Sequence, residues 1–233
     1  MSTLPIVLAL AAAQGGDISR YYQPNLQDAS FVARVVKADQ NELSKINDDF
    51  GQAYRFGTTN IHVKEPFMVR VDAKSDDTNV VFIVNGPIQL MKVPRAGFHQ
   101  RTDLSKKPGR RQTLFDFGVL TSSLFDSLYS AKFVRTDRAT GDPVYDITYQ
   151  ANDLSRSRIW IDSAHHVIAK REWYNQKGQQ LATFFYENPE EVDGIWLPTK
   201  VEVKNVDDVV AAVTNYTTVK VNTGLSDDLF STH

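Results

Sequence analysis

The sequence contains no cysteine, which excludes disulfide bonds, thiol nucleophiles and thiolate metal sites. It also lacks a large excess of either charge, because 26 Lys and Arg residues face 28 Asp and Glu residues and the formal net charge is −2. Without a positive field, binding to nucleic acid is not expected. No apolar run approaches the ~20 residues that a membrane-spanning helix needs. The 42% of hydrophobic residues therefore suits the packed core of a soluble domain.

The longest apolar run, residues 4–13, lies near the N-terminus. It resembles the h-region of a secretory signal peptide that ends in an Ala-x-Ala cleavage site at Ala11 to Ala13, although no Lys or Arg precedes it. A short buried helix is the alternative. No cysteine follows the run, so a diacylglyceryl anchor is excluded. We expect residues 1–13 to be the signal-peptide h-region and cleavage site, and residues 17–233 to form one exported, soluble domain without a lipid anchor.

Two segments have the apolar spacing of helices. Apolar residues three and four positions apart predict one long helix over residues 28–50, with Asp28 as its N-cap. Residues 113–129 are apolar nearly all round, which predicts a helix that is buried or covers a cavity. Between them, residues 95–111 are rich in Lys, Arg, Pro and Gly and predict a mobile loop.

Most of the remaining chain has the alternation of β-strands. Strands are predicted over residues 61–64, 67–73, 79–84 and 88–93, with Asn85-Gly86 as a two-residue hairpin turn. From residue 131 onward, turn sequences recur about every ten residues between paired strands, and a last strand runs from about 209 to 221. The sequence therefore predicts a mainly β (α+β) fold built by antiparallel pairing of consecutive strands.

The motifs of common catalytic and metal sites are missing. There is no glycine-rich phosphate loop, nucleophile elbow or metal-binding histidine spacing. His165 and His166 are adjacent, so on a strand they would point to opposite faces, and they predict an exposed hairpin turn and not a metal site. We expect neither an enzyme nor a cofactor. The excess of apolar surface instead suits a cavity for a lipid-like ligand, with a filled core as the alternative.

Four stretches follow one another along the chain in a characteristic order. They are Lys64-Glu65-Pro66 between two strands (61–70), a Trp-Ile-Asp hairpin (158–174), an Asp-Gly-x-Trp-x-Pro strand start (193–203) and a last strand followed by Phe230 (219–230). In order and spacing they resemble the periplasmic lipoprotein carriers, that is, the LolA-like and outer-membrane lipoprotein-sorting proteins. The resemblance covers most of residues 28–230.

This resemblance implies a curved, open antiparallel half-barrel with helices covering its concave face. It also implies a monomeric periplasmic chaperone of outer-membrane biogenesis, which shelters the acyl chains of lipoproteins or other lipids between an inner-membrane donor and an outer-membrane acceptor. The LolA-like carriers typically have Arg before the proline of the Lys-x-Pro stretch, and that Arg is involved in closing the lid and releasing the ligand. In this chain the residue at that position is Glu65. A lipid carrier of another kind, or a periplasmic regulatory domain of the envelope-stress-sensor type that binds a protein or lipoprotein, are the alternatives.

Alternation along the predicted strands, together with the predicted covering helix, assigns a set of side chains to an apolar ligand-binding cleft. A shift of one residue in any strand would turn its set to the other face. The assigned residues are Phe67, Val69, Val71, Val81, Ile83, Leu120, Leu124, Ile159, Ile161, Leu197 and Val201.

Overall fold

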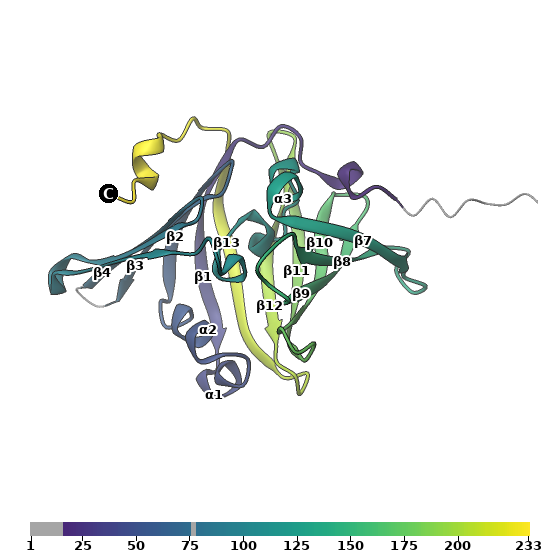
Figure 1. Ribbon diagram of the computed structural model, residues 1–233, viewed down its shortest axis with the longest axis horizontal. Helices are drawn as coiled ribbons and strands as arrows, with labels where there is room; N and C mark the ends of the chain where they lie inside the picture. Colours follow the sequence, from purple (N-terminus) through teal and green to yellow (C-terminus); the bar gives the residue numbers. More distant parts are fainter. Residues whose placement is uncertain (1–15, 76–77) are drawn as a thin grey trace, which may run out of the picture.

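A computed structural model describes residues 16–75 and 78–233, so the predicted signal-peptide h-region lies outside the described residues (Figure 1). In this part of the chain, thirteen antiparallel strands form one sheet in the order β6-β5-β4-β3-β2-β1-β13-β12-β11-β10-β9-β8-β7. Each neighbouring pair is consecutive in the chain except β1 and β13, and β6 and β7 are the two edges of the open sheet. The predicted mainly β, curved and open half-barrel is confirmed.

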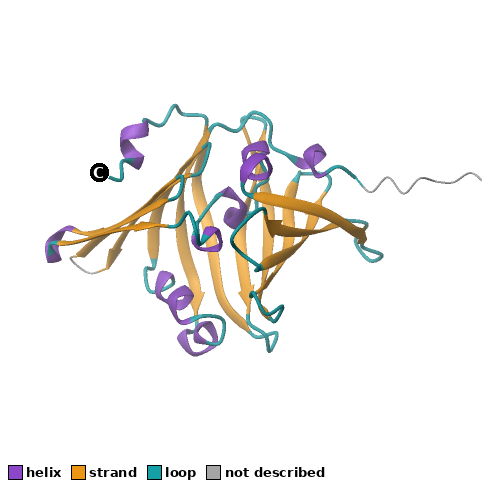
Figure 2. Ribbon diagram, viewed as in Figure 1, coloured by secondary structure: helices purple, strands orange, loops and turns teal. Residues whose placement is uncertain are grey.

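The strands are the main elements and the helices are short (Figure 2). The strands are β1 (Asp28–Ala38), β2 (Thr58–Lys64), β3 (Met68–Ser75), β4 (Thr78–Asn85), β5 (Ile88–Val93), β6 (Phe98–Asp103), β7 (Tyr129–Thr136), β8 (Pro143–Tyr149), β9 (Arg156–Asp162), β10 (Val167–Tyr174), β11 (Gln180–Val192), β12 (Ile195–Lys204) and β13 (Val210–Val221). The helices are η1 (Ile18–Tyr21), α1 (Gln40–Ser44), α2 (Asp48–Ala53), η2 (Pro94–Ala96), η3 (Pro108–Arg110), η4 (Leu114–Phe117), α3 (Ser122–Ser127) and η5 (Asp227–Phe230).

The long helix predicted over residues 28–50 is wrong. Residues 28–38 form β1, which pairs with β2 on one side and β13 on the other. Ala29, Phe31 and Ala33, every second residue of β1, point into the core. This two-residue period was overlooked because other apolar residues of the segment have helical spacing. Two short helices follow, and the carboxylate of Asp39 caps α1 by accepting hydrogen bonds from the backbone N–H groups of Asn41 and Glu42 at 3.0 and 3.3 Å.

Asp28, predicted to cap that helix, holds the C-terminal segment instead. Its buried carboxylate accepts hydrogen bonds from the backbone N–H groups of Thr223 at 2.8 Å, Gly224 at 2.9 Å and Leu225 at 3.2 Å. This contact directs the chain beyond β13 toward β3 and β4, where Phe230 is fully buried. The C-terminal segment, yellow in Figure 1, thus covers the outer face of those strands.

The mobile loop predicted over residues 95–111 is also wrong in part. Residues 98–103 form β6, an exposed edge strand paired with β5. Its two charged side chains, Arg101 and Asp103, suit an edge, because charge there discourages pairing with another sheet. The hairpin between β4 and β5 is confirmed, but its two-residue turn is Gly86-Pro87, since Asn85 still pairs with Ile88.

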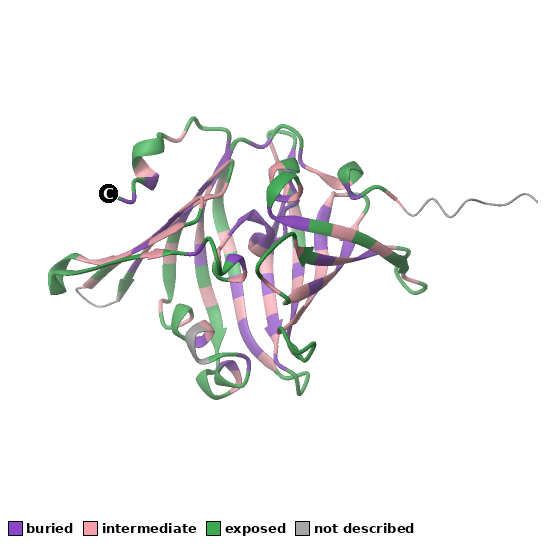
Figure 3. Cartoon of the chain, viewed as in Figure 1, coloured by how far each residue is buried: buried purple, intermediate pink, exposed green. Residues whose placement is uncertain are grey.

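One continuous helix over residues 113–129 is wrong as well, because Gly118, at φ 82°, separates η4 from α3. Residues 108–128, the covering segment, cross the concave face of the sheet (Figure 2). The ring of Phe117 lies 5.2 Å from that of Phe31 on β1 and 6.1 Å from that of Tyr216 on β13. Buried residues gather on these strands and on the covering segment (Figure 3), so the core lies between them, as predicted for helices covering the concave face.

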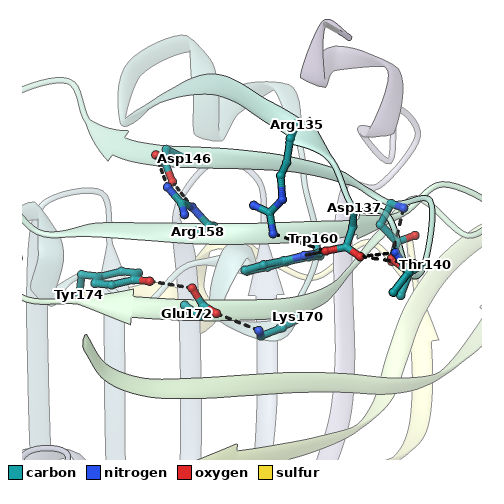
Figure 4. Close-up of polar contacts among 11 residues, drawn as sticks. Arg135, Asp137, Thr140, Asp146, Arg158, Trp160, Lys170, Glu172 and Tyr174 are labelled. Atoms are coloured by element: carbon teal, nitrogen blue, oxygen red, sulfur yellow. Dashed lines mark hydrogen bonds and ion pairs between the residues drawn. The ribbon is translucent and has the colours of Figure 1, made fainter. Parts of the chain in front are cut away.

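The opposite face of β8–β10 carries a polar network around Trp160 (Figure 4). The indole N–H donates to Asp137 at 2.9 Å, and the ammonium group of Lys170 lies 4.2 Å from the centre of the ring. Arg158 pairs with Asp146 at 2.7 Å. The residues on either side of Trp160 are fully buried in the core, so the strand alternates between an apolar inner face and a polar outer one.

Candidate functional site

A cavity of about 550 Å³ lies between the concave face of the sheet, α2 and the covering segment. Its exposed lining residues, Gln52, Ala53 and Arg110, place the opening to solvent between α2 and the covering segment. Apolar side chains make up most of the wall. They are Ala33, Val35, Phe50, Ala53, Phe56, Ile61, Val71, Ala73, Val80, Phe82, Met91, Phe115, Phe117, Trp173, Phe184 and Val201.

The wall of the cavity contains a buried ion pair between the sheet and the covering segment. Arg171 on β10 is 7% exposed and donates from Nη1 to Asp116 of η4 at 2.9 Å. Its guanidinium group also lies over the rings of Phe184, at 4.2 Å, and Phe115, at 5.3 Å. Burial alone would lower the pKa of Arg171, but Tyr186 and Asp116 outweigh it and raise that pKa, so Arg171 is a cation at every physiological pH.

Tyrosines surround this pair and remain neutral. Tyr129 and Tyr149 line the cavity, their ring centres 5.1 Å apart, and burial raises the pKa of both phenols. Burial likewise raises the pKa of Tyr186 to about 12. At neutral pH these groups present hydroxyls and not phenolates, and Asp116 is the one Asp or Glu among the described lining residues.

The structure brings only some of the predicted cleft residues to the cavity. Val71 and Val201 line it. Phe67 is partly buried against the core and does not line the cavity. The others on the inner side are buried in that core without reaching the cavity: Val69, Leu120, Leu124, Ile159, Ile161 and Leu197. Ligand contact by these residues stays a prediction.

The predicted facing of β4 is off by one residue. Val80 and Phe82 line the cavity, whereas Ile83 is buried on the other face against Phe230, with Val81 packed beside it. β4 is apolar on both faces because the C-terminal segment covers the outer one. A strand buried on both sides has no alternation from which its facing can be chosen.

Several wall residues were missed because they are aromatic or charged. Phe50 is the last residue of the helix predicted over residues 28–50, and Tyr54 lies just beyond it. Arg171 and Trp173 lie on a strand for which no cleft-facing residues were predicted. Arg171 and Trp173 are two positions apart, so they share one face of β10. A search for any large side chains with period two, and not for aliphatic ones alone, would have found this pair.

Glu65, at the position where the family typically has Arg, bonds to the covering segment. Its carboxylate accepts hydrogen bonds from the hydroxyl groups of Thr121, at 2.9 Å, and of Ser123. Burial raises the pKa of Glu65, an effect that these two hydrogen bonds reduce. The β2–β3 turn is therefore fastened to the N-terminal end of α3 by a partly buried carboxylate.

Replacing Glu65 with alanine removes both hydrogen bonds to a charged acceptor. We expect a loss of about 2 kcal/mol in the free energy of unfolding, measured by urea denaturation, together with faster exchange of any bound ligand. Glu65→Gln is the matched control, because its amide accepts from Thr121 and donates to Ser123. A Glu65→Ala protein as stable as Glu65→Gln would contradict the role of this contact.

The raised pKa of Glu65 also predicts how stability depends on pH. The folded state holds the proton more tightly than the unfolded state, so the free energy of unfolding should fall as pH rises from about 4.5 through the raised pKa. Glu65→Gln lacks this titration. Thermal unfolding from about pH 4 to 8 should show the wild-type melting temperature falling relative to that of Glu65→Gln. Parallel curves would show that folding does not shift the pKa of Glu65.

The histidine pair forms the hairpin turn predicted for it, although both side chains are half-buried. His165 Nδ1 lies 2.6 Å from the carboxylate of Asp162, and the amide group of Gln23 donates to the backbone carbonyls of His165 and His166. Within residues 16–75 and 78–233, no cluster of three or more His, Asp or Glu side chains has a geometry that could hold a metal ion. No helix in the same part of the chain is long and apolar enough to cross a membrane.

Comparisons with known proteins agree with this architecture. A family model described as "Uncharacterized protein" matches residues 112–233, and no curated protein matches the chain. Among solved structures, a LolA superfamily protein from Nitrosomonas europaea is 16% identical with a TM-score of 0.61, over 92% of this chain and 94% of the other. An outer membrane lipoprotein-sorting protein domain from Vibrio parahaemolyticus is 14% identical with a TM-score of 0.55, over 92% and 93%.

A DUF1329 family protein from Desulfovibrio piger is also similar, with 12% identity and a TM-score of 0.53 over 89% of this chain and 90% of the other. At these identities the similarity establishes a shared fold. The resemblance to LolA-like proteins inferred from the four sequence stretches is thus confirmed as a resemblance in fold.

Proposed function

This chain belongs to the family whose model, described as "Uncharacterized protein", matches residues 112–233, and it has a LolA-like fold. We propose that it is a periplasmic carrier that shelters the acyl chains of lipoproteins or other lipids. The observation that supports the proposal best is the mainly apolar cavity of about 550 Å³ under the covering segment. Its size lies within the range of ~300–1,000 Å³ that is usual for small-molecule sites.

Burial of an acyl chain supplies enough free energy without any chemistry. Each methylene moved out of water contributes about 0.8 kcal/mol, so about ten buried methylenes contribute about 8 kcal/mol before the cost of association. Release then requires either movement of the covering segment or transfer to a tighter acceptor. We accordingly propose a monomeric binding protein and not an enzyme, which is loaded by an inner-membrane donor and unloaded by an outer-membrane acceptor.

The direct test is native mass spectrometry of the protein purified from its own envelope fraction, before and after solvent extraction. We expect a stoichiometric acylated species that extraction removes and that lipid analysis identifies. A bare mass, combined with no uptake of a fluorescent fatty acid or lipopeptide by the pure protein, would overturn the carrier. The concave face would then be tested for binding a protein partner, as expected of a periplasmic regulatory domain.

A cavity-filling substitution locates the ligand. Ala73 on β3 is buried and lines the cavity, whereas its neighbour Lys74 is exposed. Ala73→Trp should abolish uptake of a fluorescent fatty acid because the indole occupies the space that the chain needs. Lys74→Trp, the matched control, should bind as the wild type does. Equal uptake by both variants, each shown to be folded by its near-UV circular dichroism, would place the ligand elsewhere.

A further inference from the structure

We propose that the cavity has an anion-binding end formed by Arg111 and Arg171, and that its ligand is an amphiphile with an acyl chain and an anionic head, a carboxylate or a phosphate. The proposal rests on the proposed function and names the class of lipid that the same cavity takes. It is supported by two arginines in one largely apolar wall whose hydrogen-bonding capacity the protein leaves unused.

Arg171 is only partly satisfied by its ion pair. Its Nη1 donates to Asp116, but its Nε is buried and has no hydrogen-bond partner. The residue is 7% exposed, so water does not replace the missing acceptor freely. A buried donor without a partner costs roughly 1–3 kcal/mol, and more when it belongs to a charged group. A ligand oxygen at this position would remove that cost.

Arg111 has even fewer partners. It lies in the covering segment, is half-buried and lines the same cavity. Its buried Nε has no partner, and its side chain makes no hydrogen bond or ion pair with any residue of the described chain. Burial lowers the pKa of Arg111, which shows that the folded protein destabilises this charge. Arginine nevertheless stays protonated at neutral pH, and Asp103, the one carboxylate that acts on its charge, forms no ion pair with it.

The two guanidinium groups belong to one region of the wall. Tyr129 and Tyr149 interact electrostatically with both Arg111 and Arg171. Both phenols are neutral at neutral pH, so their hydroxyls also offer hydrogen bonds to an anion. Asp116 is already occupied, since one of its oxygens accepts from Arg171 and the other from the backbone N–H of Thr113 at 2.9 Å.

The charge balance of this region points to one anion. Arg111 and Arg171 contribute two positive charges to the wall and Asp116 contributes its one negative charge, because the exposed Asp103, which also acts on the charge of Arg111, does not line the cavity. Charges buried without a partner are strongly unfavourable. A purely structural role explains Arg171, through its pair with Asp116, but it does not explain Arg111. Val71 on β3, Phe82 on β4 and Met91 on β5 are cross-strand neighbours, and they give the same cavity an apolar wall for the acyl chain.

The test compares ligands that share one chain and differ in the head. Hexadecanoate, hexadecyl phosphate and hexadecan-1-ol are each titrated against a bound fluorescent fatty acid, with the wild type, Arg111→Gln and the control Arg101→Gln. Arg101 is an exposed arginine of β6 that does not line the cavity. We expect the wild type and Arg101→Gln to prefer an anionic head over the alcohol by about tenfold or more, and Arg111→Gln to lose most of that preference.

The outcomes separate this inference from the carrier proposal. Preference for hexadecanoate assigns a fatty-acid-like ligand, whereas preference for hexadecyl phosphate assigns a phospholipid-like one. Either result supports the anion-binding end. If the alcohol and both anions bind equally well, and Arg111→Gln changes nothing, the anion-binding end is overturned and the carrier proposal still stands. No binding of any of the three overturns both. Because Arg111 makes no bond within the protein, Arg111→Gln should fold normally, which thermal unfolding verifies.

Discussion

Replacing Gly118 with alanine is expected to lower the free energy of unfolding by about 3 kcal/mol and to loosen the covering segment. Gly118 joins η4 to α3 at φ 82°, a conformation that costs a residue with a side chain roughly 1–2 kcal/mol. A Cβ atom here would also lie 2.7 Å from Cδ1 of Tyr186 and 2.9 Å from Cγ of Pro198. Both neighbours are buried in the sheet, so relieving the clash means lifting the segment, at roughly 1–3 kcal/mol.

Gly141→Ala separates the two contributions. Gly141 lies in the β7–β8 turn at φ 80°, but a Cβ atom there would meet nothing within 4 Å. Its alanine variant should therefore show the conformational cost alone, about 1 kcal/mol. Urea denaturation of both variants measures the difference, and ligand exchange should accelerate only in Gly118→Ala. Equal losses would show that the covering segment does not press on Tyr186 and Pro198.

The sequence predicted the strands best where each one had a single buried face. From residue 131 to the end of β13, turn residues and alternation located every hairpin, because one face packs on the core and the other, as around Trp160, is polar. The order of these strands in the sheet follows from the short turns between them, since strands that are consecutive in the chain pair with each other. The closure of β1 against β13 could not be predicted from local patterns, because it joins residues nearly 200 positions apart, such as Ala29 and Val221.

The failures have local causes. Val32, Val35 and Val36 supplied the helical spacing of residues 28–50, yet β-branched residues favour strands, and that preference decided the structure. β1 also contains two irregularities in its pairing with β13, which break the strict alternation that a sequence search needs. Asp28 looked like a helix cap because an aspartate carboxylate accepts hydrogen bonds from backbone N–H groups at the start of a helix. Here the same carboxylate accepts them from Thr223 and Gly224, which belong to a segment distant in the sequence.

The candidate site was predictable in kind and not in detail. The apolar excess predicted a cavity, and the cavity is present, but its charged end depends on three residues from two separate segments. Arg111 and Asp116 lie in the covering segment and Arg171 on β10, and only the folded chain brings them to one wall. The basic stretch around Arg111 looked like a solvated loop, because nothing local indicates that one of its six Lys and Arg side chains between residues 95 and 111 turns inward.

Asp116→Asn is expected to lower the free energy of unfolding by about 3 kcal/mol. The substitution keeps the shape of the side chain but leaves Arg171 buried without its counterion, and breaking a buried pair from one side costs roughly 3–5 kcal/mol. The lower end applies because the Asp116 side chain is 30% exposed while that of Arg171 is 9% exposed. Adding Arg171→Met should recover most of the loss, measured by urea denaturation, since the cation is then gone. A double variant no more stable than Asp116→Asn would show that the charge is not the cause.

The same variant connects stability with the ligand. With Asp116 neutralised, the anion-binding end of the cavity keeps its two cations and loses the one carboxylate in its wall, so Asp116→Asn should bind hexadecanoate more tightly than the wild type does. A ligand that binds only the folded state adds about 2.7 kcal/mol at a concentration of 100 times its Kd. Saturating hexadecanoate should therefore restore most of the stability lost in Asp116→Asn, and hexadecan-1-ol should restore less. If both ligands raise the melting temperature of Asp116→Asn equally, the acyl chain alone determines binding and the two arginines serve only the fold.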